Sequence, residues 1–231
     1  MLLDIVTLFP GICEGPLRES IVGRAQERGL VTVRTTNPRD FTRDRHRTVD
    51  DTPYGGGAGM VLKPEPLVAA VESVRGAGSH VVLLTPQGRP FTQVTARRLA
   101  GAAHLVLVCG HYEGVDERAC QAVMDEELSL GDYVLTNGTI AAVVVADAVI
   151  RLLPGVLGAD ESSQDESFGR DGWLEYPHYT RPVEFRGMRV PEVLLSGDHG
   201  NIEQWRREQS LLRTAARRPE LLQRHEETGH E

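Results

Sequence analysis

The sequence has few cysteines, and their arrangement argues against two kinds of site. Only Cys13, Cys109 and Cys120 occur, and no two of them form a CxxC pair. An odd number without regular spacing is not typical of a disulfide framework or of a zinc site built on thiolates. We therefore expect three small buried side chains in a reducing compartment.

Long hydrophobic runs and an excess of positive charge are also missing. The longest apolar run, Ile140–Ala146, is much shorter than the roughly 20 residues that span a bilayer. The first residues, MLLDIVTLFPG, contain Asp4 and lack the basic segment of a signal peptide. The net charge of −8 counts against non-specific coating of nucleic acid, although a local basic patch is compatible with it. These features predict a cytoplasmic protein with no membrane partner.

Segments of strand and helix character alternate along the first two thirds of the chain. This alternation predicts an α/β fold, with a mostly parallel sheet covered by helices on both faces. The predicted strands are Leu2–Leu8, Val31–Thr35, His80–Thr85, His104–Cys109 and Tyr133–Thr136. The predicted helices of this part are Leu17–Arg28, Pro64–Val74, Thr92–Leu99, Asp116–Met124 and Ile140–Leu153.

The pattern changes after Gly158. Residues 159–180 are polar and acidic, and a segment of this length without apolar periodicity is usually a linker or a functional lid. Helical periodicity returns at Ile202–Ala216 and at Pro219–Arg224. The sequence thus predicts an α/β domain at residues 1–158, a linker at 159–180 and a small helical C-terminal domain at 181–231.

Three glycine-containing turns follow three predicted strands, at Thr85–Arg89, Cys109–Gly114 and Leu135–Gly138. Ligands of open parallel sheets bind beyond the carboxyl ends of the strands, where glycine lets backbone approach a ligand closely. Glycine is also the ordinary residue of any turn, so each turn alone is weak evidence. Together they favour a nucleotide-like ligand. The motifs GxGxxG and GxxxxGK(S/T) are absent, which disfavours a dinucleotide site and a P-loop.

A basic segment precedes a glycine-rich stretch. Arg39–Arg47 holds four arginines and one histidine against two aspartates, and Tyr54–Met60 reads YGGGAGM. Positive charge beside a backbone that can approach closely fits a phosphate or ligand loop. A flexible loop after a solvated charge run is the plainer interpretation.

Seven motifs in order resemble the bacterial tRNA (guanine-N1)-methyltransferase family. They are PRDFTRDRHRTVDDTPYGGGAGMV, LTPQGR, CGHYEGVDER, GDYVLTNG, RLLPGVLG, YPHYTRP and VLLSGDHGNIEQWRREQSL. The resemblance extends from the first predicted strand to about Leu222. It implies a trefoil-knotted fold of the SPOUT class and a homodimer with active sites between the subunits. It also implies transfer of a methyl group from S-adenosylmethionine to N1 of guanosine 37 of tRNA, on the 3′ side of the anticodon.

The resemblance places the cofactor in the knot. The residues that it implies are Pro86, Gln87, Gly88, Gly110, Tyr112, Glu113, Gly114, Leu130, Gly131, Asp132, Tyr133, Val134, Leu135, Asn137, Gly138 and Ala141. The family often has glycine at the position of Asn137 and commonly proline at that of Ala141. Because asparagine tolerates a positive φ, we expect the turn to be kept.

Methylation of guanine N1 requires a base for its proton and a positive group near O6. The resemblance assigns the base to the acid before Ser167, which is Glu166 here and Asp in the family, with Asp165 as the alternative. It assigns the O6 contact to Arg151, although Asp147 and Arg151 have the spacing of a simple helical ion pair. Magnesium is expected from the resemblance, but the sequence has no dedicated metal cluster.

The C-terminal stretch Trp205–Arg218 contains five arginines and one glutamate, and predicts a face that contacts tRNA phosphates. Two other functions stay open. A SPOUT-fold methyltransferase with another RNA target would keep the same cofactor turns. A non-catalytic RNA- or nucleotide-binding module would keep the fold and lose the base, since Glu166 replaces the usual Asp.

Overall fold

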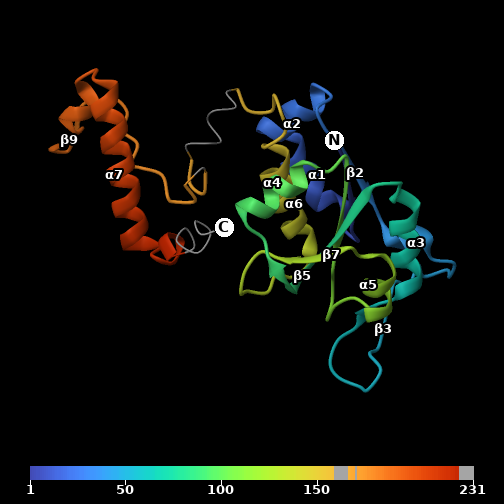
Figure 1. Cartoon of the computed structure of the whole chain (residues 1–231). Helices are drawn as coiled ribbons and strands as arrows, with labels where there is room; N and C mark the ends of the chain where they lie inside the picture. The colour runs from blue at the N-terminus through green and yellow to red at the C-terminus, as the bar shows by residue number, and fades with distance from the viewer. Residues whose placement is uncertain (159–165, 170, 224–231) are drawn as a thin grey trace. The chain divides into compact units, whose positions relative to one another are not determined.

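Five parallel strands form the central sheet of the computed structural model, which describes residues 1–158, 166–169 and 171–223 (Figure 1). Their order is β2 (Thr32–Thr36), β1 (Leu2–Val6), β6 (His104–Cys109), β5 (Ser79–Pro90) and β7 (Glu126–Ser129). All the neighbouring pairs of this sheet are parallel. The predicted α/β class with a mostly parallel sheet is therefore confirmed, whereas the knot stays a prediction.

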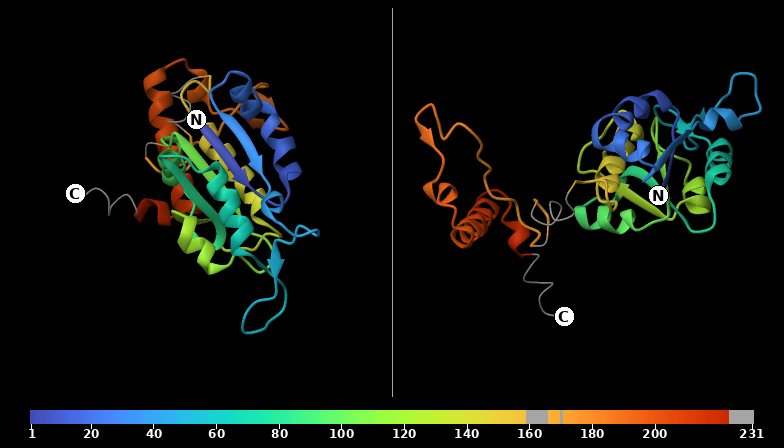
Figure 2. Two further views of the ribbon diagram at one scale, coloured as in Figure 1. Left: turned by 90° about the vertical axis from the view of Figure 1, so that its right-hand side faces the viewer. Right: turned by 90° about the horizontal axis from the view of Figure 1, so that it is seen from above.

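Helices cover both faces of this sheet (Figure 2). One face packs against α1 (Pro10–Arg18), α2 (Ser20–Glu27), α4 (Gln93–Ala100) and α6 (Gly138–Ile150). The other packs against α3 (Pro64–Val74) and α5 (Glu117–Val123). Successive side chains of a strand point to opposite faces, so β1, β5 and β6 contribute residues to the hydrophobic core on each face of the sheet. The middle of the sheet is buried on both sides, which explains the largely apolar sequences of β1 and β6.

The structure corrects the predicted strand Tyr133–Thr136. These residues lie in the connection between β7 and α6, and the fifth strand is β7, whose sequence is EELS. Two adjacent glutamates are unusual in a strand, which is why the pattern missed it. Glu126 is kept there by hydrogen bonds to Arg98 (2.7 Å) and His80 (2.9 Å), so that its charge is paired.

Two more predicted features differ. Thr85–Arg89 is an irregular part of β5 and not a turn after it, because the pairing with β7 shifts register between Leu84 and Arg89 and then continues. The predicted helix Leu17–Arg28 is two helices, since Glu19 is extended (φ −100°, ψ 162°). Gly23 permits this break, because a Cβ there would lie 2.1 Å from the carbonyl oxygen of Arg18.

A small hairpin carries the glycine-rich stretch. The strands β3 (Asp50–Asp51) and β4 (Val61–Leu62) are antiparallel, and the 3-10 helix η1 (Pro38–Phe41) precedes them. Gly55, Gly56, Gly57 and Gly59 all have positive φ, a conformation that side chains rarely adopt. Tyr54 at the start of this loop is 99% exposed.

The chain consists of two compact units, Met1–Gly158 and Ala159–Glu231. The second contains the hairpin β8 (Glu184–Phe185) and β9 (Met188–Arg189), the 3-10 helix η3 (Glu192–Leu195), the helix α7 (His199–Arg217) and helical residues 220–223. Asp198 caps α7 by accepting hydrogen bonds from two backbone N–H groups of its first turn. Among the described residues of this unit only Gly169, Thr214 and Leu221 are buried. No helix in the described ranges is long and apolar enough to cross a membrane.

Candidate functional site

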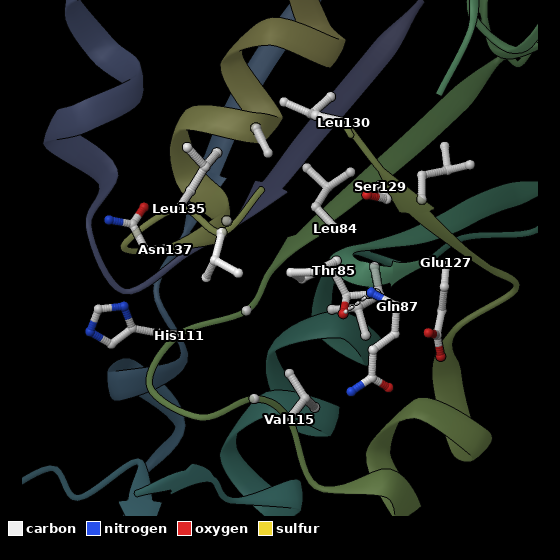
Figure 3. A pocket seen from close by; sticks show the side chains of 18 of the residues that line it. Leu84, Thr85, Gln87, His111, Val115, Glu127, Ser129, Leu130, Leu135 and Asn137 are labelled. Atoms are coloured by element: carbon white, nitrogen blue, oxygen red, sulfur yellow. Dashed lines mark hydrogen bonds between the residues drawn. The ribbon is translucent and has the colours of Figure 1, made fainter. Parts of the chain in front are cut away.

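A cavity of about 440 Å³ lies beyond the carboxyl ends of β6 and β7 and beside the irregular part of β5 (Figure 3). Four segments form most of its wall, namely Leu83–Gln87, Gly110–Val115, Glu127–Leu130 and Tyr133–Gly138. Figure 3 shows Leu135 and Asn137 across the cavity from Gln87 and Glu127. A concave site of this size suits a nucleoside-sized ligand.

Most of the residues predicted for the cofactor line this cavity. They are Pro86, Gln87, Gly110, Tyr112, Glu113, Gly114, Leu130, Tyr133, Val134, Leu135, Asn137, Gly138 and Ala141. Gly88, Gly131 and Asp132 are not part of its lining. Gly88 and Gly131 instead pack closely against residues that do line it. A Cβ on Gly88 would lie 2.4 Å from the backbone nitrogen of Leu128, and one on Gly131 would lie 2.8 Å from the Tyr133 ring.

Several lining residues were not among those assigned to the cofactor, although His111 and Thr136 lie in two of the predicted turns; Glu127 and Ser129 are two others. Glu127 and Ser129 belong to the strand that the pattern missed. His111 packs edge-on against Phe9, with ring centroids 5.0 Å apart. Burial lowers the pKa of His111, and the charge of Arg39 lowers it further, so the imidazole is neutral at physiological pH.

Asn137 has a different role from the one expected. Its φ of −165° is ordinary extended backbone, so tolerance of a positive φ is not what keeps the turn. The residue is the N-cap of α6, and its side-chain oxygen accepts a hydrogen bond from the N–H of Thr139 at 2.9 Å. Asparagine is among the best capping residues, so the departure from glycine strengthens the start of the helix.

The start of α6 is fastened to two neighbouring segments. The N–H of Gly138 donates to the carbonyl of Gly110 at 2.8 Å. The hydroxyls of Thr139 and Thr7 are hydrogen-bonded at 2.7 Å in the interior, which ties α6 to the end of β1. Gly138 is needed for this approach, because a Cβ would lie 2.8 Å from the backbone nitrogen of Gly110.

The glycine-rich hairpin is joined to the second wall segment of the cavity. Glu113 donates its N–H to the carbonyl of Met60 at 2.9 Å, and Leu62 donates to that of Gly114 at 3.0 Å. Arg39 of the basic segment also reaches this wall, since its guanidinium lies 3.4 Å from the hydroxyl of Tyr112. The structure thus brings the basic segment and the glycine-rich loop to the cavity.

The cysteines take no evident part in chemistry. Cys13 and Cys109 are buried, and Cys120 is half-buried. Burial raises the pKa of the Cys13 thiol and, separately, that of Cys120 to about 11, and raises the pKa of Cys109 still further. Thiols with such pKa values are protonated and unreactive at neutral pH. No group of three His, Cys, Asp or Glu side chains that could hold a metal occurs in the described part of the chain.

The residues predicted for the chemistry lie on different units. Arg151 is half-buried at the end of α6, where its N–H donates to the carbonyl of Asp147 at 3.1 Å. Glu166 is half-buried in the second unit, in a turn closed by a hydrogen bond from the N–H of Gly169 to its carbonyl at 2.9 Å. Asp165 lies outside the described residues.

An open parallel sheet with a cavity at its carboxyl edge is the arrangement in which α/β proteins commonly bind small molecules. Comparison with known proteins identifies the family. The chain belongs to the tRNA (guanine-1)-methyltransferase TrmD family, whose model matches residues 1–224. The family predicted from the seven motifs is therefore confirmed.

Individual relatives agree over nearly the whole chain. A tRNA (guanine-N(1)-)-methyltransferase of Pelotomaculum thermopropionicum is 60% identical over 226 residues, covering 96% of this chain and 90% of the relative. Proteins with the same description from Carboxydothermus hydrogenoformans and Brevibacillus brevis are each 57% identical. The alignment with the Carboxydothermus protein covers 96% of this chain and 87% of the relative. The alignment with the Brevibacillus protein covers 97% of this chain and 92% of the relative.

Proposed function

We propose that this protein transfers the methyl group of S-adenosylmethionine to N1 of guanosine 37 in tRNA. The observation that carries the proposal is the cavity in which the wall segments predicted for the cofactor come together. Membership of the family over residues 1–224 supports the reaction and its tRNA substrate. We place the reaction in the cytoplasm, where the substrate is available.

The cavity fits the cofactor in its chemistry as well as in its size. Apolar side chains such as Leu84, Leu135 and Ala141 offer surface to an adenine ring, and the neighbouring segments offer backbone groups to its polar edge. Glu113 and Glu127 also line the cavity, and their negative charge suits a ligand with a sulfonium and an ammonium group. When bound, S-adenosylmethionine supplies an electrophilic methyl group on positively charged sulfur.

The protein's own task is to make guanine N1 nucleophilic. We assign removal of the N1 proton to the carboxylate of Glu166, with Asp165 as the alternative. We assign stabilisation of the negative charge that moves to O6 to the guanidinium of Arg151, a permanent cation with several donors. Glutamate has one methylene more than the usual aspartate, so its reach depends on how the surrounding turn is held.

A homodimer is part of the proposal. Ile140 and Val144 lie one turn apart on α6 and are 44% and 46% exposed, although most other residues of this helix are buried. Met188 and Leu212 of the second unit are also exposed. Exposed apolar groups of this kind favour burial against a second copy or a substrate. A requirement for Mg²⁺ is a further expectation from the resemblance, and methylation with and without a chelator tests it.

The deciding experiment uses purified protein, labelled cofactor and two unmodified tRNA transcripts that carry guanosine or adenosine at position 37. We expect methylation of the first transcript alone. Methylation that does not depend on guanosine 37 would favour another RNA target. Cofactor binding without any methylation would favour the non-catalytic module.

A further inference from the structure

The segment that follows Glu166 is attached to α7 through its backbone. Ser210 and Thr214 are four residues apart and therefore lie on one face of the helix. Thr214 Oγ1 accepts a hydrogen bond from the N–H of Leu174 at 3.0 Å, and the Ser210 hydroxyl donates to the carbonyl of Leu174. Two hydroxyls of α7 thus satisfy both backbone groups of one residue, as a neighbouring strand would.

Thr214 is the central residue of this attachment. Its side chain is fully buried, and few other residues described in this unit are buried. Its hydroxyl is doubly used, because it also donates to the carbonyl of Ser210 at 2.8 Å. A buried hydroxyl is tolerated only when such partners are present, so loss of the oxygen would leave the Leu174 N–H without its acceptor.

Leu174, the residue that α7 holds, is connected to Glu166 by a loop with hydrogen bonds of its own. The N–H of Phe168 donates to the carbonyl of Trp173 at 2.7 Å, and the N–H of Glu175 donates to the hydroxyl of Ser167 at 3.1 Å. Phe168 has a φ of +64°, which a bulky residue adopts only when its surroundings hold it there. Glu166 stands at the start of this loop, so its position depends on contacts made further along the segment.

Arginines near the end of the chain pack on aromatic rings of the same segment. Distances from the guanidinium carbon to the ring centroid are 4.8 Å for Arg206 with Tyr176, 5.8 Å for Arg207 with Trp173 and 5.9 Å for Arg218 with Phe168. Cations over rings at this distance are attractive. Arginines that the sequence assigned to tRNA phosphates therefore also contact the loop that begins with Glu166.

We propose that Thr214 and Ser210 are positioning residues for the carboxylate that removes the N1 proton. The inference rests on the proposed function and adds that α7, the arginine-rich helix, fixes the geometry of the base. A general base must lie within hydrogen-bond reach of the proton it takes, and displacement of about 1 Å can cost a hundredfold in rate. Release of the loop from α7 would move the carboxylate without removing it.

The test compares Thr214→Val, which removes the hydroxyl at nearly constant size, with Thr214→Ser, which keeps it. Thr32→Val, on the exposed first residue of the edge strand β2, is the matched control. Single-turnover methylation is measured at saturating cofactor and tRNA, together with the Kd of each. The chain has two tryptophans, so a Trp205→Phe background makes Trp173 fluorescence a reporter of the loop.

We expect Thr214→Val to lower the single-turnover rate by about tenfold or more, as the loss of one buried partner implies. The Kd for cofactor and for tRNA should stay within threefold, and acrylamide quenching of Trp173 should increase. Thr214→Ser and Thr32→Val should retain the wild-type rate and quenching.

Three results would overturn the inference: an unchanged rate in Thr214→Val, no recovery in Thr214→Ser, or loss of tRNA binding as large as the loss of rate. An inactive wild-type protein would instead refute the proposed function.

Discussion

Replacement of Gly138 by alanine tests whether contact between α6 and the Gly110 turn builds the cofactor cavity. The added Cβ would lie 2.8 Å from the backbone nitrogen of Gly110 and 3.0 Å from the Cα of Cys109. Both neighbours are backbone atoms, so neither can rotate away. Ordinary contact begins at 3.4 Å, so the helix start and the turn must separate by about 0.6 Å.

That separation has a cost to stability and a cost to binding. The hydrogen bond from Gly138 to Gly110, now 2.8 Å, would stretch to the limit of a useful bond. Overpacking of a fitted interior typically costs about 1–3 kcal/mol, and the better helix propensity of alanine offsets part of this. We expect the free energy of unfolding to fall by about 1–2 kcal/mol. The Kd for S-adenosylmethionine should rise at least about tenfold, because both residues line the cavity.

Denaturant unfolding and calorimetric titration with S-adenosylmethionine measure the two effects. Gly11→Ala is the matched control, because Gly11 is also near the start of a helix and no atom lies within 4 Å of the added Cβ. It should bind the cofactor like the wild type and be at least as stable. If Gly138→Ala behaves like Gly11→Ala in both measurements, the close approach does not shape the cavity and our argument fails.

Three further substitutions test the chemistry and the sheet. Glu166→Gln should lower the single-turnover rate at least about a hundredfold with cofactor binding intact, as expected for loss of a general base; if only Asp165→Asn does so, the assignment of the base is wrong. Arg151→Lys should lower the rate about tenfold or more because an ammonium group lacks the guanidinium fork, and an equal loss of cofactor affinity would contradict a role at O6. Burial tends to raise the pKa of Glu126, but its partners Arg98 and His80 lower it overall. The charged Glu126 side chain therefore stabilises the fold fully above its unfolded pKa of about 4.3, and this stabilisation is lost as the pH falls through the lower folded pKa. Glu126→Gln should therefore reduce stability at pH 7 by about 1 kcal/mol and much less once the pH lies below the folded pKa; a reduction that stays constant as thermal unfolding is followed to acid pH would count against this.

Part of the candidate site could be predicted because glycine turns and apolar strands leave local signals. The residues of the Gly110–Gly114 turn and those after Leu130 were found in this way and by resemblance, and most of them line the cavity. Glu127 and Ser129 were missed, since nothing local distinguishes a polar side chain that faces a cavity from one that faces water. Their inclusion depends on β5, β6 and β7 lying side by side.

The sequence by itself determined the family and the parallel α/β architecture. Apolar periodicity reflects burial directly, and for this reason the predicted bounds of α3 (Pro64–Val74) and β6 (His104–Cys109) agree with the structure. Such patterns depend only on residues close together in the chain.

Tertiary structure alone decided what depends on contacts between distant residues. The EELS sequence of β7 becomes a strand because β5 pairs with it and because Arg98 and His80 bind Glu126. Asn137 is a cap because α6 begins there, and Thr214 holds Leu174 although 40 residues separate them. Pairing, capping and docking are satisfied by partners that no local pattern encodes, so they became visible only in the folded chain.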